Sequence, residues 1–368
     1  MAEGFLYSQP VKIRFGADAL PGGLEETLRE LGCRKAVIVC GRHFEPKARA
    51  LSERFPEIAG IFAGVEPNPQ LSGAVKTAEI AREAGADTVI GIGGGSALDT
   101  AKFAAAIAPG SASPDDYYTG AVPFPARPLS VIAVPTTAGT GSEVTQVAVI
   151  SRGKEKRTIN HPVFMPKAAI VDPLLSLSVP SRTAMCTGLD ALAHALEGYW
   201  SRNHQPISDL MAVEAVRLIL KNLEQVWTAG PGKDLPAHSA MAMASLLGGL
   251  SFALPKTAGC HACSYPLSED YHLSHGEACA FTLDSFVRIN ADARLEELCR
   301  RVGLAGTEEL AGRIRHLKGL AHLKCRLSDL GTVDLEKLCR DAAAHPLMKN
   351  NPAPMDENAL RAMFEALV

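Results

Sequence analysis

Four residues in the second half of the chain have side chains that bind transition metals, namely Asp190, His194, His261 and His275. Asp190 and His194 are four residues apart in a segment with a strong helical pattern, so both side chains should lie on one face of a helix, one turn apart. His261 and His275 come later and flank a stretch that we expect to be irregular. One carboxylate and three imidazoles are a suitable ligand set for Fe(II) or Zn(II).

The same residues also allow less specific interpretations. An aspartate and a histidine four residues apart are most often a surface or capping pair, and a single histidine most often has a structural role. Cys260 and Cys263 flank His261 and would allow a Cys-His-x-Cys zinc knuckle, but no second matched pair accompanies them. His272 and Glu277 are near enough in sequence to support the ligands through hydrogen bonds.

A glycine-rich turn lies upstream, between a predicted strand and a predicted helix, at residues 91–102. Its glycines let the backbone approach a ligand closely, and the N–H groups that open the helix can hold a pyrophosphate. The turn has neither the Rossmann fingerprint nor the Walker A spacing, so a tight turn without a ligand is the alternative. The side chains and backbone that we assign to the cofactor here are those of Gly94, Gly95, Ser96 and Asp99.

A second polar turn follows the next predicted strand, at residues 135–145. Ligands of α/β sheets gather at the carboxyl ends of the strands, so this turn should lie beside the glycine-rich one. Its hydroxyl groups are good donors to ribose or phosphate, and a threonine-rich capping loop is the alternative. The candidate residues are Thr136, Thr137, Thr140 and Ser142.

The first half of the chain alternates short apolar runs with helical segments. We predict strands at 35–40, 88–92, 129–135 and 168–173 and a helix at 97–108. Continuous valine and isoleucine runs separated by helices are typical of a parallel sheet covered on both faces. After Pro180 helical periodicity dominates, as in 208–223, 239–250 and 291–302. The chain should therefore divide into an α/β domain, residues 1–180, and an all-α domain, residues 181–368.

Composition excludes several classes of function. The chain is 47% hydrophobic with a net charge of −3, and it has no basic block or interleaved aromatic stripe, so nucleic acid is not expected as a partner. No apolar run is long enough to cross a membrane, and the first residues do not resemble a signal peptide. The nine cysteines are an odd, scattered set, which fits reduced thiols in the cytoplasm.

These motifs together resemble the iron-dependent (group III) alcohol dehydrogenases over nearly the whole chain. The segments that carry the resemblance are 13–20, 66–69, 93–102, 135–145, 166–173, 187–197, His275-Gly276 and 351–354, which follow in the family's order. The resemblance implies a Rossmann-like N-terminal domain and a helical C-terminal domain, the fold shared with dehydroquinate synthase. It also implies that the metal and the nicotinamide meet in the cleft between them, and that the protein is a homodimer.

The resemblance also implies roles for particular residues. Asp190, His194, His261 and His275 would be the catalytic metal ligands. The residues near NAD(P) would be Asn68, Gly94, Gly95, Ser96, Thr136, Thr137, Thr140 and Lys156, of which Lys156 is placed by counting back from Pro162.

Two departures from the family pattern are informative. Many members have a histidine four residues after the third ligand, but this chain has Tyr265, so a proton-relay role at that position is not supported. Many NAD-preferring members end the first strand with an aspartate that would repel a 2′-phosphate. This chain has Gly41 followed by Arg42, which predicts that NADPH is accepted as well as NADH.

The predicted activity is hydride transfer between a nicotinamide and a small alcohol or aldehyde held at the metal, which acts as a Lewis acid. The run from Ser264 to Leu267 resembles a branch that reduces phosphonoacetaldehyde or sulfoacetaldehyde. Alternatives are a short-chain alcohol or polyol dehydrogenase and a maleylacetate-type reductase of the same family. More distant alternatives are a lyase like the dehydroquinate synthases and a non-catalytic metal and nucleotide sensor.

Overall fold

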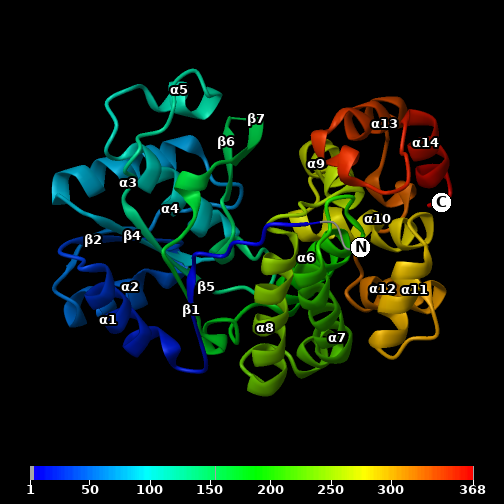
Figure 1. Ribbon diagram of the computed structural model, residues 1–368, viewed down its shortest axis with the longest axis horizontal. Helices are drawn as coiled ribbons and strands as arrows, with labels where there is room; N and C mark the ends of the chain where they lie inside the picture. Colours follow the sequence, from blue (N-terminus) through cyan, green and yellow to red (C-terminus); the bar gives the residue numbers. More distant parts are fainter. Residues whose placement is uncertain (1–3, 154, 368) are drawn as a thin grey trace. The chain divides into compact units, whose positions relative to one another are not determined.

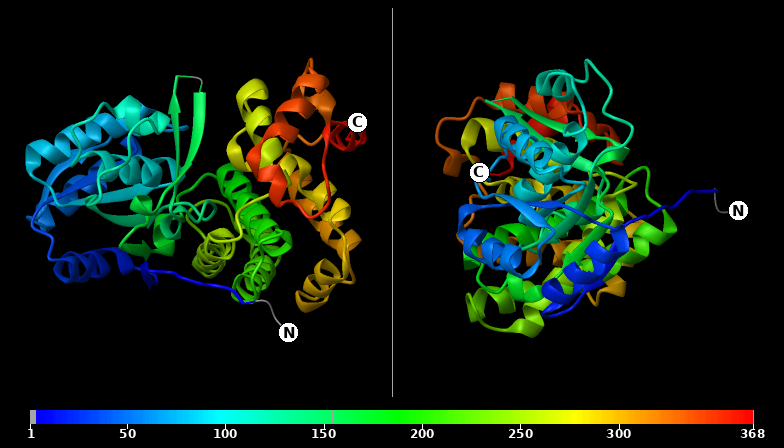
Figure 2. Two further views of the ribbon diagram at one scale, coloured as in Figure 1. Left: turned by 45° about the horizontal axis from the view of Figure 1, so that its top comes forward. Right: turned by 90° about the vertical axis from the view of Figure 1, so that its left-hand side faces the viewer.

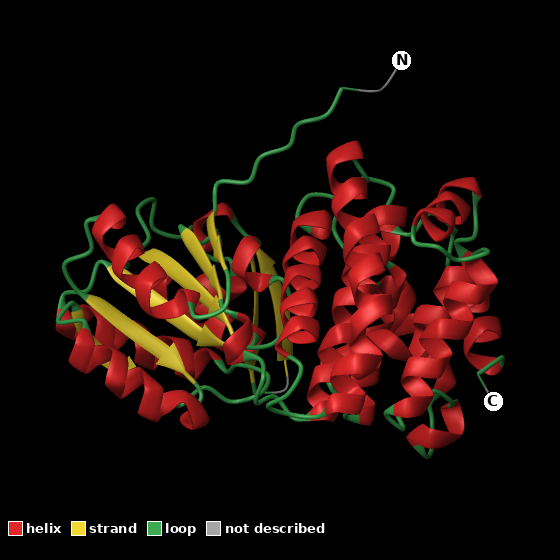
Figure 3. Ribbon diagram, turned by 90° about the horizontal axis from the view of Figure 1, so that it is seen from below, coloured by secondary structure: helices red, strands yellow, loops and turns green. Residues whose placement is uncertain are grey.

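The structure is a computed structural model that describes residues 4–153 and 155–367, and these form two compact units (Figure 1). The α/β unit comprises Ser8–Thr137 and Ser142–Ser176. The helical unit comprises residues 177–367 with residues 4–7 and Ala138–Gly141. Figure 3 shows that the strands belong to one group of elements and that the other group is helical. None of the described helices is long and apolar enough to cross a membrane.

The α/β unit is built on a six-stranded sheet in the order β1-β8-β5-β4-β2-β3, with every pair parallel. This confirms the predicted parallel sheet. The strand β3 was not predicted, because Gly60 and the partly exposed residues beside it interrupt its apolar run. The strand bounds are β1 (Lys12–Phe15), β2 (Ala36–Cys40), β3 (Ile58–Phe62), β4 (Thr88–Gly93), β5 (Ser130–Pro135) and β8 (Ala168–Val171).

Helices cover both faces of this sheet (Figure 1). Successive side chains of a strand point to opposite faces, so a strand whose residues are all apolar needs a cover on each face. On β2, Ile38 and Cys40 pack with the helices on one face, α1 (Ala19–Leu31) and α2 (Glu45–Arg54). Val37 and Val39 point the other way, toward α3 (Leu71–Ala84) and α4 (Gly95–Ile107). The remaining elements are α5 (Pro114–Thr119) and the antiparallel hairpin of β6 (Val147–Arg152) and β7 (Glu155–Asn160), which was not predicted.

The helical unit surrounds α6 (Ser181–Trp200), which is buried along most of its length. In Figure 2 the green helices α6–α8 lie beside the yellow and orange helices that follow them. The three helices predicted in this unit are present, but their first residues differ from the predicted ones. One begins at a proline, Pro206, and the other two begin after a capping aspartate, Asp234 or Asp292. The bounds are α7 (Pro206–Ala229), α8 (Leu235–Phe252), α9 (Gly259–Tyr271), α10 (His275–Ile289), α11 (Ala293–Arg301), α12 (Thr307–Leu320), α13 (Leu335–Ala344) and α14 (Glu357–Glu365).

The stretch between His261 and His275 is not irregular, and this expectation was wrong. It forms helix α9, which contains Pro266 in its interior. A proline there removes one helix hydrogen bond, so its presence in the sequence speaks against a helix. The helix forms because Cys260, Cys263 and Leu267 bury one face in the core of the unit. His261 therefore lies in the first turn of a helix, and His275 is the first residue of the next one.

Candidate active site

Helix α6 brings three ionisable side chains into the core of the helical unit. Asp190, His194 and Glu197 are 2%, 5% and 0% exposed. The helix is enclosed because its neighbours approach closely at glycines: a Cβ on Gly188 would lie 2.4 Å from a Leu223 methyl carbon. Charged groups buried in this way need partners, so their contacts indicate what the site does.

Glu197 orients His261. One carboxylate oxygen of Glu197 accepts a hydrogen bond of 2.6 Å from the backbone N–H of Cys260, which holds the first turn of α9. The other oxygen contacts Nδ1 of His261. Because a carboxylate accepts, Nδ1 carries a proton, and Nε2 carries the lone pair whenever the ring is neutral. A histidine that ligates a metal typically has its second nitrogen held in this way.

His194 is oriented by a backbone carbonyl. Its Nδ1 lies 3.2 Å from the carbonyl oxygen of Gly139, so this nitrogen donates and Nε2 again carries the lone pair. Gly139 comes this near because it lacks a side chain: a Cβ there would lie 2.7 Å from Cβ of Thr187. The ring of Phe252 stacks on the other side of His194, with centroids 4.2 Å apart.

His275 reaches the same place from the start of α10. A Cβ on Gly276 would lie 2.1 Å from the Cys186 carbonyl oxygen, so only glycine lets α10 begin against α6. Nε2 of His275 lies 3.7 Å from Oδ1 of Asp190, and Nε2 of His261 lies at the same distance from that oxygen. The sequence-predicted residues Asp190, His261 and His275 are therefore brought together.

The arrangement has the chemistry of a metal site. Nε2 of His194 and Nε2 of His261 are 3.0 Å apart, so they face each other directly, and two neutral rings would present a lone pair from each side. Such a pair is repulsive unless a cation or a proton lies between them, so the donor set fits a divalent ion. A ligand atom of Cys279 joins those of Asp190, His261 and His275, with all of them within 4.8 Å of one another. Cys279 was not predicted from the sequence.

The two buried imidazoles differ electrostatically. Burial lowers the pKa of His194 well below its ordinary value, and the charge of His261 acts in the same direction. Burial also acts to lower the pKa of His261, but the Cys279 and Glu197 side chains outweigh it and hold that pKa well above the ordinary value. In the protein without metal, a proton on His261 therefore fills the 3.0 Å contact between the two nitrogens. A divalent ion would take the place of that proton, and the negative charge of Glu197 would compensate part of its charge.

The glycine-rich turn in the α/β unit joins β4 to α4. A Cβ on Gly93 would lie 2.6 Å from Cβ of Ala97, so the turn is packed tightly against its own helix. Gly94, Gly95 and Ser96 are partly exposed and open the 13-residue helix α4. Thr137 comes from the next turn, and its Oγ1 lies 3.2 Å from the position of a Cβ on Gly94. The structure thus brings the two predicted turns together.

Asp99 and Ser142, which the sequence analysis assigns to the cofactor, lie in a buried polar network instead of at the turn's surface. Oγ of Ser142 donates to Oδ1 of Asp99 at 2.7 Å, and the backbone N–H of Val149 donates to the other carboxylate oxygen at 2.9 Å. Nζ of Lys102 donates to Ser142 and to the Val147 carbonyl. These side chains tie α4 to the segment that follows β5.

Asn68 and Lys156 lie on connected segments of the α/β unit. Asn68 is exposed and has a φ of 55°. The backbone N–H of Ser151 donates to the Pro69 carbonyl at 2.9 Å, and Ser151 pairs with Lys156 in the hairpin.

The other predicted cofactor residues lie near the ends of strands of the sheet. Gly41 follows β2, where a Cβ would lie 3.1 Å from the His43 ring. Thr136 is buried and Thr140 partly buried.

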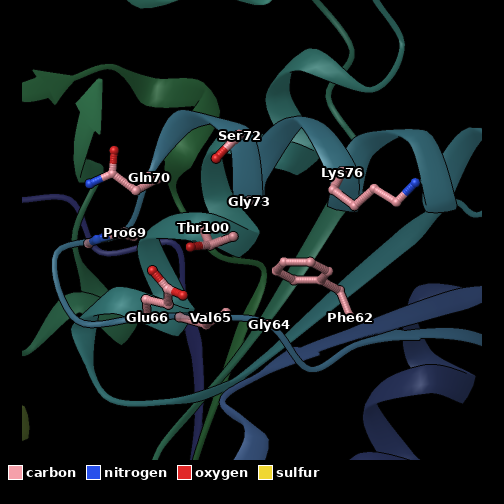
Figure 4. Close-up of a pocket in the computed structure, with 10 residues that line it drawn as sticks. All are labelled: Phe62, Gly64, Val65, Glu66, Pro69, Gln70, Ser72, Gly73, Lys76 and Thr100. Carbon is pink, nitrogen blue, oxygen red and sulfur yellow. The ribbon is translucent and has the colours of Figure 1, made fainter. Parts of the chain in front are cut away.

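A cavity of about 260 Å³ lies in the same unit. Figure 4 shows that its lining comes from the end of β3, the connection that follows, the start of α3 and one residue of α4. The residues are Phe62, Gly64, Val65, Glu66, Pro69, Gln70, Ser72, Gly73, Lys76 and Thr100. None of the predicted cofactor residues is among them, although Pro69 is the neighbour of Asn68.

Comparisons with known proteins identify the family. A model of iron-containing alcohol dehydrogenases matches residues 10–173, and a model of the C-terminal part of the Fe-containing alcohol dehydrogenase family matches residues 184–368. The chain belongs to the iron-containing alcohol dehydrogenase family. This confirms the resemblance inferred from the motifs and the fold that it implied, and it identifies the protein as an oxidoreductase.

Relatives within the iron-containing alcohol dehydrogenases act on several alcohols and aldehydes. The chain is 36% identical to long-chain-alcohol dehydrogenase 1 of Geobacillus thermodenitrificans, over 83% of this chain and 81% of the relative. It is 35% identical to 1,3-propanediol dehydrogenase of Citrobacter freundii, over 80% and 77%. A crystal structure of sulfoacetaldehyde reductase from Bifidobacterium kashiwanohense in complex with NAD+ matches with a TM-score of 0.95 and 37% identity, over 100% and 99%.

Glu197, Gly139 and Phe252 were not predicted from the sequence. Glu197 could have been found, because it lies three residues after His194 and seven after Asp190, on the same face of a helix with few polar residues. Gly139 and Phe252 act through a backbone carbonyl and a ring face. No residue pattern in the sequence predicts these two contacts.

Proposed function

We propose that this member of the family is a metal-dependent, NAD(P)-linked alcohol dehydrogenase that reduces small acidic aldehydes such as sulfoacetaldehyde or phosphonoacetaldehyde. The aldehyde, NAD(P)H and one proton give the primary alcohol and NAD(P)+. The observation that carries the metal-dependent activity is the pair of Nε2 atoms of His194 and His261, 3.0 Å apart, with each Nδ1 held by an acceptor. The convergence of Asp190 and His275 supports it. The acidic aldehydes are proposed from the likeness to sulfoacetaldehyde reductase.

Asp190, His194, His261 and His275 would hold the ion, with Fe(II) favoured by the family and Zn(II) also suited to this set of nitrogen and oxygen ligands. The ion would supply a Lewis acid that polarises a carbonyl oxygen. Glu197 and the Gly139 carbonyl fix the two imidazole rings, so their nitrogens need no reorientation during the reaction. Phe252 keeps water from one face of His194.

The α/β unit would hold the nicotinamide cofactor. The backbone N–H groups of Gly94, Gly95 and Ser96 at the start of α4 would bind the pyrophosphate, since a helix N-terminus attracts anions. Thr136, Thr137 and Thr140 would donate to the cofactor, with Asn68 and Lys156 nearby. Asp99 and Ser142 would contribute by holding the two turns in place through Lys102.

We also propose that NADPH is accepted as well as NADH, because Gly41 places no carboxylate after β2 and Arg42 is exposed beside it. The substitution Gly41→Asp should raise the ratio of kcat/KM for NADH to that for NADPH about tenfold, as expected for a charge repulsion of roughly 1.4 kcal/mol. The measurement is initial rates with both cofactors. An unchanged ratio would show that this position does not contact the adenosine ribose.

The proposed activity can be tested with metal-free protein reloaded with Fe(II) or Zn(II). Oxidation of NADPH and NADH is followed with sulfoacetaldehyde, phosphonoacetaldehyde, propanal, 3-hydroxypropanal and maleylacetate, and a chelator serves as the control. The proposal predicts stoichiometric consumption of reduced cofactor, abolished by the chelator. Turnover with only the neutral aldehydes would favour the short-chain alcohol dehydrogenase alternative, and maleylacetate alone would favour that reductase.

A homodimer in the cytoplasm is part of the same proposal. Light scattering coupled to size-exclusion chromatography measures the mass in solution. A monomer at micromolar concentration would contradict the dimer without affecting the proposed reaction.

A further inference from the structure

Lys256 has a backbone conformation that its residue type disfavours. The described residues include six non-glycine residues with positive φ, and five of them are aspartate, asparagine or histidine, the types that tolerate this conformation best. The sixth is Lys256, with φ of 70°. A long side chain in the left-handed region costs about 1 kcal/mol relative to glycine. The side chain at this position should therefore have a use that offsets the cost.

The ammonium of Lys256 has no negative partner among the described residues. Its Nζ donates to the carbonyl of Ala253 at 2.8 Å, and no described carboxylate acts on it electrostatically. The residue is half-buried, and burial lowers the pKa of its ammonium. The Ala253 carbonyl lies at the C-terminus of α8 and offers the ammonium only a partial negative charge. A bound anion would supply the full counter-charge that this partly desolvated cation lacks.

The loop that carries Lys256 is fixed beside the proposed metal site. It joins α8 to α9, and it begins directly after Phe252, whose ring lies on His194. Oγ of Ser201 donates to the Pro255 carbonyl at 2.8 Å, and Nδ2 of Asn350 donates to the Thr257 carbonyl at 2.8 Å. The ammonium folds back onto the carbonyl that follows Phe252, so its position relative to His194 is set by a short, anchored segment.

A pair of stacked rings supplies neutral donors in the same unit. Tyr265 is one turn after His261 on α9, and its ring stacks on His345 with centroids 4.2 Å apart. Nδ1 of His345 accepts from the backbone N–H of Leu347, so Nε2 carries the proton. The short helix that starts after His345 ends at Asn350, which holds the Lys256 loop.

We propose that Lys256 binds the acidic end of the substrate, which makes small aldehydes with a sulfonate or phosphonate group the substrate class of this site. The inference rests on the proposed aldehyde reductase function and names the residue that selects among aldehydes. Tyr265 and His345 are neutral donors to the same anionic group. Lys256 takes no part in hydride transfer, so its contribution depends on the charge of the substrate.

The kinetic test compares substrates of different charge in three variants. Lys256→Met removes the charge, Lys256→Arg keeps it, and Lys349→Met removes an exposed lysine from the neighbouring short helix as a matched control. Lys256→Met should lower kcat/KM for sulfoacetaldehyde and phosphonoacetaldehyde about 10- to 100-fold, as loss of a charged hydrogen bond does. For propanal the change should stay within about threefold. Lys256→Arg should retain most of the preference, and Lys349→Met should change neither value.

A binding measurement separates recognition from turnover. The probe is ethanesulfonate, which has the acidic group but no carbonyl, with its dissociation constant measured by calorimetry. It should bind the wild type and Lys256→Arg, and it should bind Lys256→Met at least about tenfold more weakly. Equal binding to the wild type and Lys256→Met would overturn the proposal. Comparing sulfonate, phosphonate and carboxylate aldehydes in the wild type identifies which acidic group is preferred.

Lys256→Gly provides a second criterion that does not depend on activity. Relief of the positive φ should raise the free energy of unfolding by about 1 kcal/mol while abolishing the preference for acidic aldehydes. If the wild type reduces propanal as efficiently as sulfoacetaldehyde, and Lys256→Met lowers both equally, this inference fails and the proposed reductase remains. If no aldehyde is reduced after metal loading, the proposed function itself fails.

Discussion

Two buried polar networks, one in each unit, use similar residue types in opposite ways. In the α/β unit Asp99, Ser142 and Lys102 bond to one another and to backbone groups, so their bonding capacity is used within the fold. In the helical unit Glu197 and the Gly139 carbonyl occupy only the Nδ1 atoms of two histidines. Burial and charge alone therefore do not distinguish a structural network from a reactive one. The direction of the remaining lone pairs does.

The most severe way to break the reactive network is to remove one converging nitrogen. His261→Ala should leave less than one metal ion per protein and lower kcat at least about 10³-fold, because Lewis-acid stabilisation is worth several kcal/mol. Metal content by mass spectrometry and initial rates are the measurements. Full metal content with wild-type activity in this variant would remove His261 from the ligand set.

The matching change in the structural network should act on stability and not on metal. Lys102→Met leaves the Asp99 carboxylate, 3.9 Å from Nζ, without its cation in a buried place. The free energy of unfolding should fall by about 3–5 kcal/mol, the range for breaking a buried ion pair. Denaturant titration measures the change, and metal content should stay at the wild-type value. Loss of metal without loss of stability would reverse the roles given to the two networks.

The structural network should also make stability depend on pH. Glu143 follows Ser142 in the chain, is buried, and acts electrostatically on Lys102 of this network. Burial raises the pKa of Glu143 from an ordinary 4.5 to about 7. Its protonated form therefore stabilises the fold fully below pH 4.5, and this stabilisation is lost as pH rises through 7. Glu143→Gln should remove that loss, which is at most about 3 kcal/mol at 1.4 kcal/mol per pKa unit.

The measurement is the free energy of unfolding of the wild type and of Glu143→Gln between pH 4.5 and pH 7. The wild type should lose more stability than the variant over this window. Burial lowers the pKa of Lys102 to about 8, so Lys102 titrates above the window and does not mask the difference. Parallel curves for the two proteins would be incompatible with a buried neutral Glu143.

A milder change to the reactive network acts on the orientation of a ligand. Glu197→Gln keeps the size of the side chain but removes the charge that holds Nδ1 of His261, and it should lower metal affinity about 10- to 100-fold. Glu224→Gln is the matched control, because Glu224 contacts the exposed His316 at 3.2 Å on the surface of the same unit. Equal effects of the two substitutions would mean that the contact with Glu197 has no special role.

The sequence was most informative where a structural feature depends on residues that are close together in the chain. The spacing of Asp190 and His194 predicted one helix face, and valine and isoleucine runs predicted the buried parallel strands. It failed where a local pattern is overridden by packing. Pro266 made α9 look irregular, although the burial of its cysteine face maintains the helix. Asp99 and Ser142 carry the right groups for a cofactor, but only the fold shows that these groups are turned toward each other.

Contacts made by backbone atoms were also beyond reach of the sequence. The Gly139 carbonyl orients His194, and the close approach at Gly276 places His275 beside Asp190. Both depend on a missing side chain at one residue and a neighbour far along the chain. Lys256 is similar, because its positive φ cannot be recognised without the backbone.

The proposed set of metal ligands is tested most directly by X-ray absorption at the metal edge of Zn(II)-loaded protein. We predict that the ion is surrounded by nitrogen and oxygen at about 2.0–2.2 Å, with the multiple-scattering pattern of three imidazoles and with no sulfur. His261→Ala should lose one imidazole from that pattern. A sulfur ligand at about 2.3 Å, as Cys279 would provide, or a shell with no imidazole, would contradict it.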